Sequence, residues 1–156
     1  MAGTFLEPYA RLFVLLHAAA AIVLIGSSTH HFLISLAYAR GSYRLRLGRI
    51  YALVGACAYG VTFVLGCLAY PTYRYYVRGL YFDRHVEWAS NLFDIKENFA
   101  AIGLPLVVGA LVLSRVMDAR EDVALRRGYI VMVGLVAAIV WFNVISGLLI
   151  TMAKGV

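Results

Sequence analysis

The chain alternates between long apolar runs and shorter polar segments, and four of the runs are long enough to cross a membrane. A hydrocarbon core of about 30 Å needs a helix of roughly 20 apolar residues. The first run exceeds this length, so its helix is expected to tilt or to project from the bilayer. The pattern predicts an all-α, four-transmembrane-helix bundle in a single integral membrane domain, residues 1–156. The predicted spans cover approximately residues 9–40, 50–70, 97–117 and 128–152.

The connection between the second and third spans, residues 71–96, is predicted to be ordered. It is rich in Tyr, Trp and Arg, which suits a segment at the level of the lipid headgroups. Pro71 is predicted to end the second helix because proline cannot continue helical hydrogen bonding. Asp94 and Glu97 are predicted to form a capping box that opens the third helix.

Composition and charge support a membrane protein. The chain is 63% hydrophobic and 14% charged, so it is too apolar for a water-soluble domain. The net charge of +6 comes from basic residues beside the apolar runs, which indicates topology signals rather than nucleic-acid binding. The first run lacks the flanks of a signal peptide and is expected to remain as a helix.

Arginines also predict the orientation. The two short loops and their flanks hold eight of them, and under the positive-inside rule both loops face the cytoplasm. Both termini and the 71–96 connection are then expected on the outer, periplasmic side of a bacterial inner membrane. These arginines are Arg40, Arg44, Arg46, Arg49, Arg115, Arg120, Arg126 and Arg127.

Histidines provide the strongest candidate chemistry. His17, His30 and His31 lie in the first span, where an ionisable side chain is costly unless it faces the interior, a cavity or a ligand. The 14-residue step from His17 to His31 returns within roughly 40° of the same helix face, about 21 Å further along the axis. The spacing predicts two candidate ligands on one stripe, near opposite leaflets.

This spacing resembles the helices of b-type membrane cytochromes, in which two axial histidines on one helix hold haems near both membrane faces. The resemblance implies haem b bound through His17, His31 or His30. The matching pair on a second helix is absent, since the other three spans contain no histidine. One alternative pairs His17 with His85 of the outer connection, and another takes ligands from a second copy of the chain.

The first span also carries consecutive hydrogen-bonding side chains from Ser27 through Ser28 and Thr29 to the two histidines. A proton relay or quinone-headgroup site would explain them, because histidine exchanges protons near neutral pH. Alternatively, the hydroxyls bond to their own helix backbone. Tyr59 and Asn143 are the expected intramembrane partners of this run.

A second candidate site lies in the outer connection. His85, Glu87, Asp83 and Glu97 supply an imidazole and carboxylates that could bind zinc, iron or copper. The alternative is structural, with the carboxylates capping a helix or pairing with nearby arginines.

These observations favour a small membrane redox protein or respiratory-complex subunit that binds haem b through first-helix histidines and exchanges electrons with quinone. One alternative is a cofactor-free accessory subunit that scaffolds a homo- or hetero-oligomer. The other is a metal-dependent membrane enzyme or transporter with its site at the outer connection. The sequence shows no nucleophile motif or phosphate loop, which argues against hydrolases and kinases.

Overall fold

Four long helices form the molecule. The computed structural model describes residues 3–154, and this part of the chain contains helices and no strands. The elements in order are η1 (Glu7–Tyr9), α1 (Ala10–Ala39), α2 (Leu45–Thr72), η2 (Tyr73–Phe82), α3 (Asp83–His85), α4 (Glu87–Val116) and α5 (Val123–Ala153). The four long helices are each long and apolar enough to cross a membrane, which confirms the predicted all-α four-helix architecture.

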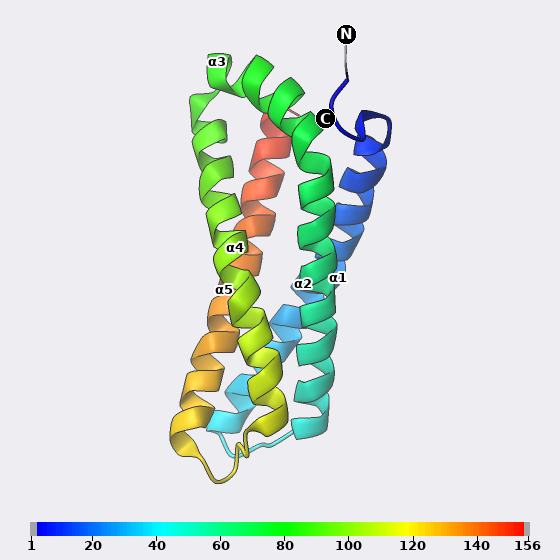
Figure 1. Cartoon of the computed structure of the whole chain (residues 1–156). Helices are drawn as coiled ribbons and strands as arrows, with labels where there is room; N and C mark the ends of the chain where they lie inside the picture. The colour runs from blue at the N-terminus through cyan, green and yellow to red at the C-terminus, as the bar shows by residue number, and fades with distance from the viewer. Residues whose placement is uncertain (1–2, 155–156) are drawn as a thin grey trace.

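The helices run alternately up and down around a square. α1 packs against α2 and α5, and α4 packs against the same two helices, so α1 and α4 occupy opposite corners. Both termini, η2 and α3 lie at one end of the bundle, here called the lid end (Figure 1). The two short loops lie at the opposite end, here called the loop end (Figure 1).

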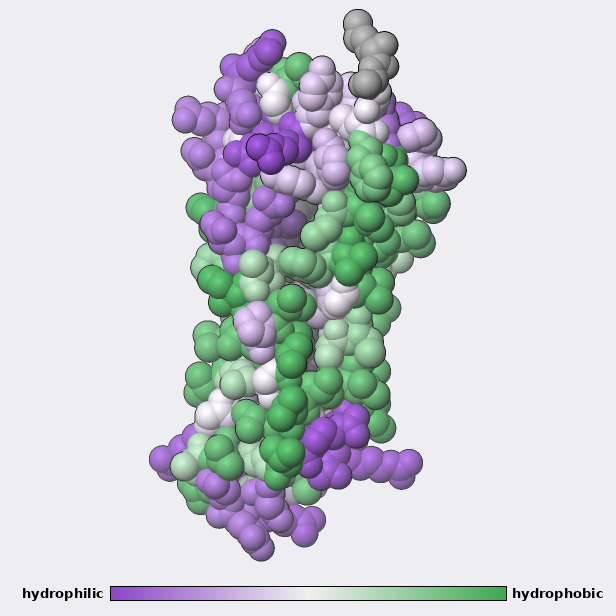
Figure 2. Space-filling model, viewed as in Figure 1, coloured by the Kyte–Doolittle hydropathy of each residue, from purple (hydrophilic) through white to green (hydrophobic). Residues whose placement is uncertain are grey.

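The surface matches a protein surrounded by lipid. Figure 2 shows a hydrophobic band around the middle of the visible face, with hydrophilic residues gathered at both ends. Large apolar side chains such as Ile22, Leu33 and Leu148 are exposed along the helices. Such a band is costly in water and favourable in acyl chains, as expected of an integral membrane protein.

The second helix does not end where the sequence predicts. α2 continues through Pro71 to Thr72 and passes directly into η2, a ten-residue π-helix. The prediction that Pro71 ends the helix is wrong, because proline removes only one backbone donor and a bundle tolerates that loss. The wider π turns are rare and are often found at functional sites.

The capping-box prediction is also wrong. α4 begins at Glu87, ten residues before the predicted span, so Asp94 lies inside the helix. Its carboxylate instead accepts two hydrogen bonds from the Arg78 guanidinium, at 2.5 and 2.8 Å. This bidentate pair attaches η2 to α4, so η2 lies across the lid end as an ordered lid (Figure 1).

A close contact in the middle of the bundle joins α2, α4 and α5. The Tyr59 hydroxyl donates to the Ala100 carbonyl at 2.8 Å, and Tyr59 is 4% exposed. Gly103 leaves room for this hydroxyl, since a Cβ on Gly103 would collide with it and would lie 3.2 Å from Ile139. The contact depends on glycine at this position.

We predict that Gly103→Ala lowers the free energy of unfolding by about 1–3 kcal/mol, because Tyr59 must move and lose its hydrogen bond. Gly60→Ala is the matched control, since a Cβ on Gly60 would meet nothing within 4 Å. That control is expected to be neutral or slightly stabilising, because alanine favours helix. Thermal unfolding in detergent measures both, and equal effects of the two substitutions would contradict the prediction.

Candidate functional site

The four histidines fall into two groups. His17 and His31 turn toward neighbouring helices, where His17 is half-buried and His31 is buried. His30 and His85 are exposed. The helical period explains the difference between His30 and His31, because consecutive residues point about 100° apart.

His17 is held by the backbone of α2. Its Nδ1 lies 2.8 Å from the Thr62 carbonyl oxygen. A carbonyl only accepts, so Nδ1 carries the proton and Nε2 keeps its lone pair. The ring lies against Gly66, where a Cβ would be 3.3 Å from the imidazole. A histidine fixed in this way presents Nε2 to a ligand, as metal-binding histidines commonly do.

Lys96 of α4 points toward the same region. Its Cε lies 3.7 Å from the position that a Cβ on Gly147 of α5 would occupy, so the side chain turns toward the neighbouring helix. His17 and Lys96 both lie in the lid-end half of the bundle, since His17 follows the start of α1 at Ala10 by seven residues and Lys96 follows the start of α4 at Glu87 by nine. In residues 3–154, no carboxylate lies within the 4.0 Å ion-pair distance of the Lys96 ammonium. The ammonium lies over the Phe93 ring, whose centroid is 5.4 Å away.

Two buried oxygens of the lid-end half also lack partners. These are Thr62 Oγ1 and the Tyr73 hydroxyl, for which the described residues offer no hydrogen bond. The Tyr73 ring stacks on the Phe93 ring with centroids 4.3 Å apart. The Lys96 ammonium lies over the same Phe93 ring. His17, Thr62, Tyr73 and Lys96 are called the lid-end cluster below.

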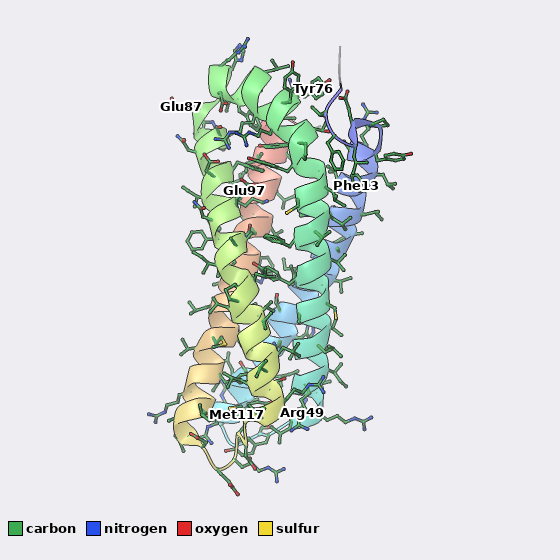
Figure 3. All side chains as sticks on the ribbon, in the orientation of Figure 1. Phe13, Arg49, Tyr76, Glu87, Glu97 and Met117 are labelled. Atoms are coloured by element: carbon green, nitrogen blue, oxygen red, sulfur yellow. The ribbon has the colours of Figure 1, made fainter. Side chains whose placement is uncertain are left out.

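The cluster lies beneath the lid. Figure 2 shows the surface hollowed between the lid-end halves of α4 and α2, with hydrophilic atoms inside the hollow. Glu97 follows Lys96 on the same half of α4 (Figure 3) and also has no ion-pair partner within 4.0 Å in the described chain. Lys96 and Glu97 are adjacent and oppositely charged, so each partly offsets the other, and a bound polar group would supply the hydrogen bonds that neither side chain makes in the described chain.

The other interior histidine is satisfied within the protein. His31 Nε2 lies 2.6 Å from the Tyr129 hydroxyl, and Tyr129 is 1% exposed. The Tyr38 ring stacks on the Tyr129 ring, and the two ring centroids are 6.2 Å apart. A cavity of about 10 Å³ adjoins them at the loop end, where Arg49 and Met117 are labelled in Figure 3. The arrangement holds α1 against α5 and leaves room for about one water.

Two of the three hydroxyls in residues 27–29 bond to their own helix backbone, as the structural alternative predicts. Ser27 and Ser28 donate to the carbonyls of Leu24 and Ile25 in their own helix, at 3.1 and 3.3 Å. Thr29 instead accepts from the Trp141 indole at 3.0 Å. No part of this run extends the His31 hydrogen bond into a relay.

The two expected partners of this run bond elsewhere. Tyr59 donates to Ala100 of α4, and Asn143 donates to the Ile139 carbonyl of its own helix at 2.9 Å. The partners in the structure are Tyr129 and Trp141. They come from the fourth span, as does Asn143, but from different positions along it.

The two exposed histidines share one local geometry. His30 Nδ1 lies 2.7 Å from the Gly26 carbonyl, and His85 Nδ1 lies 3.0 Å from the Tyr81 carbonyl, four residues back in each case. Each ring stacks on a tyrosine, Tyr51 for His30 and Tyr81 for His85. Both keep Nε2 as a free acceptor.

The predicted metal ligands are not assembled into one site. Asp83 accepts from Ser90 at 2.5 Å and lies 3.7 Å from Arg78, whereas His85 stacks on a tyrosine. Across residues 3–154, the structure contains no group of three or more His, Cys, Asp or Glu side chains that could hold a metal ion. The partners of Asp83 therefore favour the structural alternative for that residue.

Sequence reasoning did not identify five residues of these sites, namely Thr62, Tyr73, Lys96, Tyr129 and Trp141. Lys96 precedes the predicted start of the third span, so the sequence predicts it among the headgroups, whereas α4 begins at Glu87 and carries it into the bundle. Tyr129 and Thr62 lie in apolar runs without a periodic polar pattern. A lysine next to a long apolar run was the one available signal.

We predict that Tyr129→Phe lowers the free energy of unfolding by about 1–3 kcal/mol, because it leaves the buried His31 nitrogen without its partner. Tyr75→Phe is the control, since Tyr75 is 55% exposed and its hydroxyl makes no hydrogen bond within residues 3–154. Thermal unfolding of both variants provides the measurement. Equal stability of the two variants would show that the His31 contact is dispensable.

Comparison with known proteins does not identify a relative. No family model, curated protein or solved structure matches the chain.

Proposed function

We propose that the protein is a small membrane redox protein, acting alone or as a subunit of a respiratory-type complex, that binds a quinone headgroup at the lid-end cluster. One observation carries the proposal. Lys96 turns a charged side chain toward α5 without a carboxylate partner within 4.0 Å among residues 3–154, in the lid-end half that also holds the unpartnered oxygens of Thr62 and Tyr73. An ionisable residue at membrane depth is a functional candidate by default.

The chemistry of the cluster suits a quinone. A ligand at this depth must dissolve in the membrane and carry hydrogen-bonding atoms. The Lys96 ammonium has donors for a quinone oxygen, and the unpartnered hydroxyls of Thr62 and Tyr73 can bond to the oxygens of a quinone or quinol.

Haem b is the redox centre proposed to exchange electrons with the quinone. Three histidines fit a ligand role, because His17, His30 and His85 each give Nδ1 to a carbonyl and keep Nε2 free. Haem would supply one-electron transfer. His85 in α3 and the lid-end part of α1 lie on opposite sides of the bundle in Figure 1, so a second ligand from another chain is favoured over a His17–His85 pair.

We also propose that the lid end faces the outer, periplasmic side of a bacterial inner membrane. The eight arginines of the short loops and their flanks gather at the loop end, and six Lys and Arg residues remain elsewhere. The positive-inside rule then directs the loop end to the cytoplasm. The quinone would bind in the outer leaflet.

We predict that Lys96→Met weakens quinone binding at least about tenfold, because a charge-assisted hydrogen bond is lost. Lys154→Met is the control, since Lys154 follows α5 and lies over Tyr81 outside the cluster. Titration of the protein in lipid nanodiscs with a short-chain quinone, followed by tryptophan fluorescence, measures both. Equal affinities of the two variants, or no binding by the unmodified protein, would refute the quinone site.

We predict that the protein purified after expression with ample haem shows a Soret band that His17→Ala removes. His31→Ala is the informative comparison, since the Nε2 of His31 already bonds to Tyr129 and the band should persist. Absorption spectra of matched protein amounts test this. A colourless preparation would favour the alternative of a cofactor-free accessory subunit.

A further inference from the structure

An unusual pair of polar rings lies on the lipid-facing side of α1 and α2. His30 is exposed, and its ring stacks on Tyr51 with centroids 5.4 Å apart and planes 11° apart. One turn away, the same faces carry exposed apolar side chains, Leu33 on α1 and Leu47 and Val54 on α2. The pair is therefore a polar spot within an apolar surface.

The pair lies along the helices rather than at their ends. His30 precedes the end of α1 at Ala39 by nine residues, which is about 14 Å along the axis. Tyr51 follows the start of α2 at Leu45 by six residues, about 9 Å. Acyl chains offer no hydrogen bonds, so unpaired polar atoms at this depth are costly.

One ring offers an acceptor and the other a donor. The Nδ1 of His30 bonds to the Gly26 carbonyl, which leaves Nε2 as an acceptor. Neither this nitrogen nor the Tyr51 hydroxyl has a hydrogen-bond partner within residues 3–154. The stacked rings thus present one unused acceptor and one unused donor side by side on the α1–α2 surface.

We infer that the α1–α2 face around His30 and Tyr51 is a two-fold interface with a second copy of this chain, in which His30 Nε2 accepts from the partner's Tyr51. The two-fold axis would run along the membrane normal, which keeps both copies in the same orientation. Each acceptor then meets the donor of the other copy, and two hydrogen bonds form at once. This self-complementarity favours a second copy over an unrelated subunit.

The interface is independent of the quinone proposal, and it changes the role of one candidate ligand. His30 Nε2 is used by the dimer and is not available to haem. Hydrogen bonds between membrane helices hold such contacts in place, and the surrounding Leu33, Leu47 and Val54 supply van der Waals packing.

Cysteine cross-linking in native membranes tests the interface. Cys57 and Cys67 are first replaced by alanine, and single cysteines are placed at Val54 on the proposed face and at Val112 on α4 as a control. Both positions are exposed, at 39% and 53%. We expect Val54→Cys to form a disulfide-linked dimer on oxidation, and Val112→Cys to remain monomeric. Absence of the Val54 dimer, equal dimer formation by both, or a cross-link to a different protein would overturn the inference.

Two further substitutions test the hydrogen bonds themselves. His30→Leu and Tyr51→Phe are each expected to raise the dimer dissociation constant in mild detergent about tenfold, with the double variant no weaker than either single one. Leu33→Val is the packing control and should change the dimer little. Circular dichroism verifies that each variant folds. Unchanged dimerisation of His30→Leu, or additive effects of the two substitutions, would overturn the proposed bonds.

Discussion

The absence of water in the hydrocarbon core is the constraint on which the structure depends. Every polar group in the core must find a hydrogen-bond partner within the protein or in another molecule. A group without a partner costs free energy. Most interior groups are satisfied locally or across helices, as Ser27 is by its own helix, Tyr59 by α4 and His31 by Tyr129. The exceptions are concentrated in the lid-end cluster and at His30, and these are the places where the proposals lie.

The lid and the cluster belong to one structural unit. η2 brings Tyr73 over Phe93, the ring that Lys96 approaches, and the Arg78–Asp94 pair fixes η2 to α4. A continuous helix through Pro71 makes this arrangement possible, because the chain crosses the end of the bundle without a flexible loop. The polar cluster therefore has an ordered cover at one end and an apolar surface at its sides.

One helix gives its three histidines three different environments. His17 bonds to a backbone carbonyl of α2, His31 to a side chain of α5, and His30 to its own helix. Helical phase decides between interior and surface, and the neighbouring helix decides the partner. Of the two interior rings, only that of His17 bonds through Nδ1 to a backbone carbonyl and keeps Nε2 free, which separates a candidate ligand from a structural contact.

The sequence by itself determined the four spans, because hydrophobic length is a local property, and it placed His17 and His31 on one stripe, because the helical period is fixed. It could not determine that Lys96 enters the bundle or that Asp94 pairs with Arg78. It also could not determine that His31 bonds to Tyr129, which lies 98 residues further along the chain. These facts depend on which helices are neighbours and how each is rotated. In a helix that is apolar on nearly every side, the sequence pattern gives little indication of how the helix is rotated about its axis. Only tertiary packing decided that rotation.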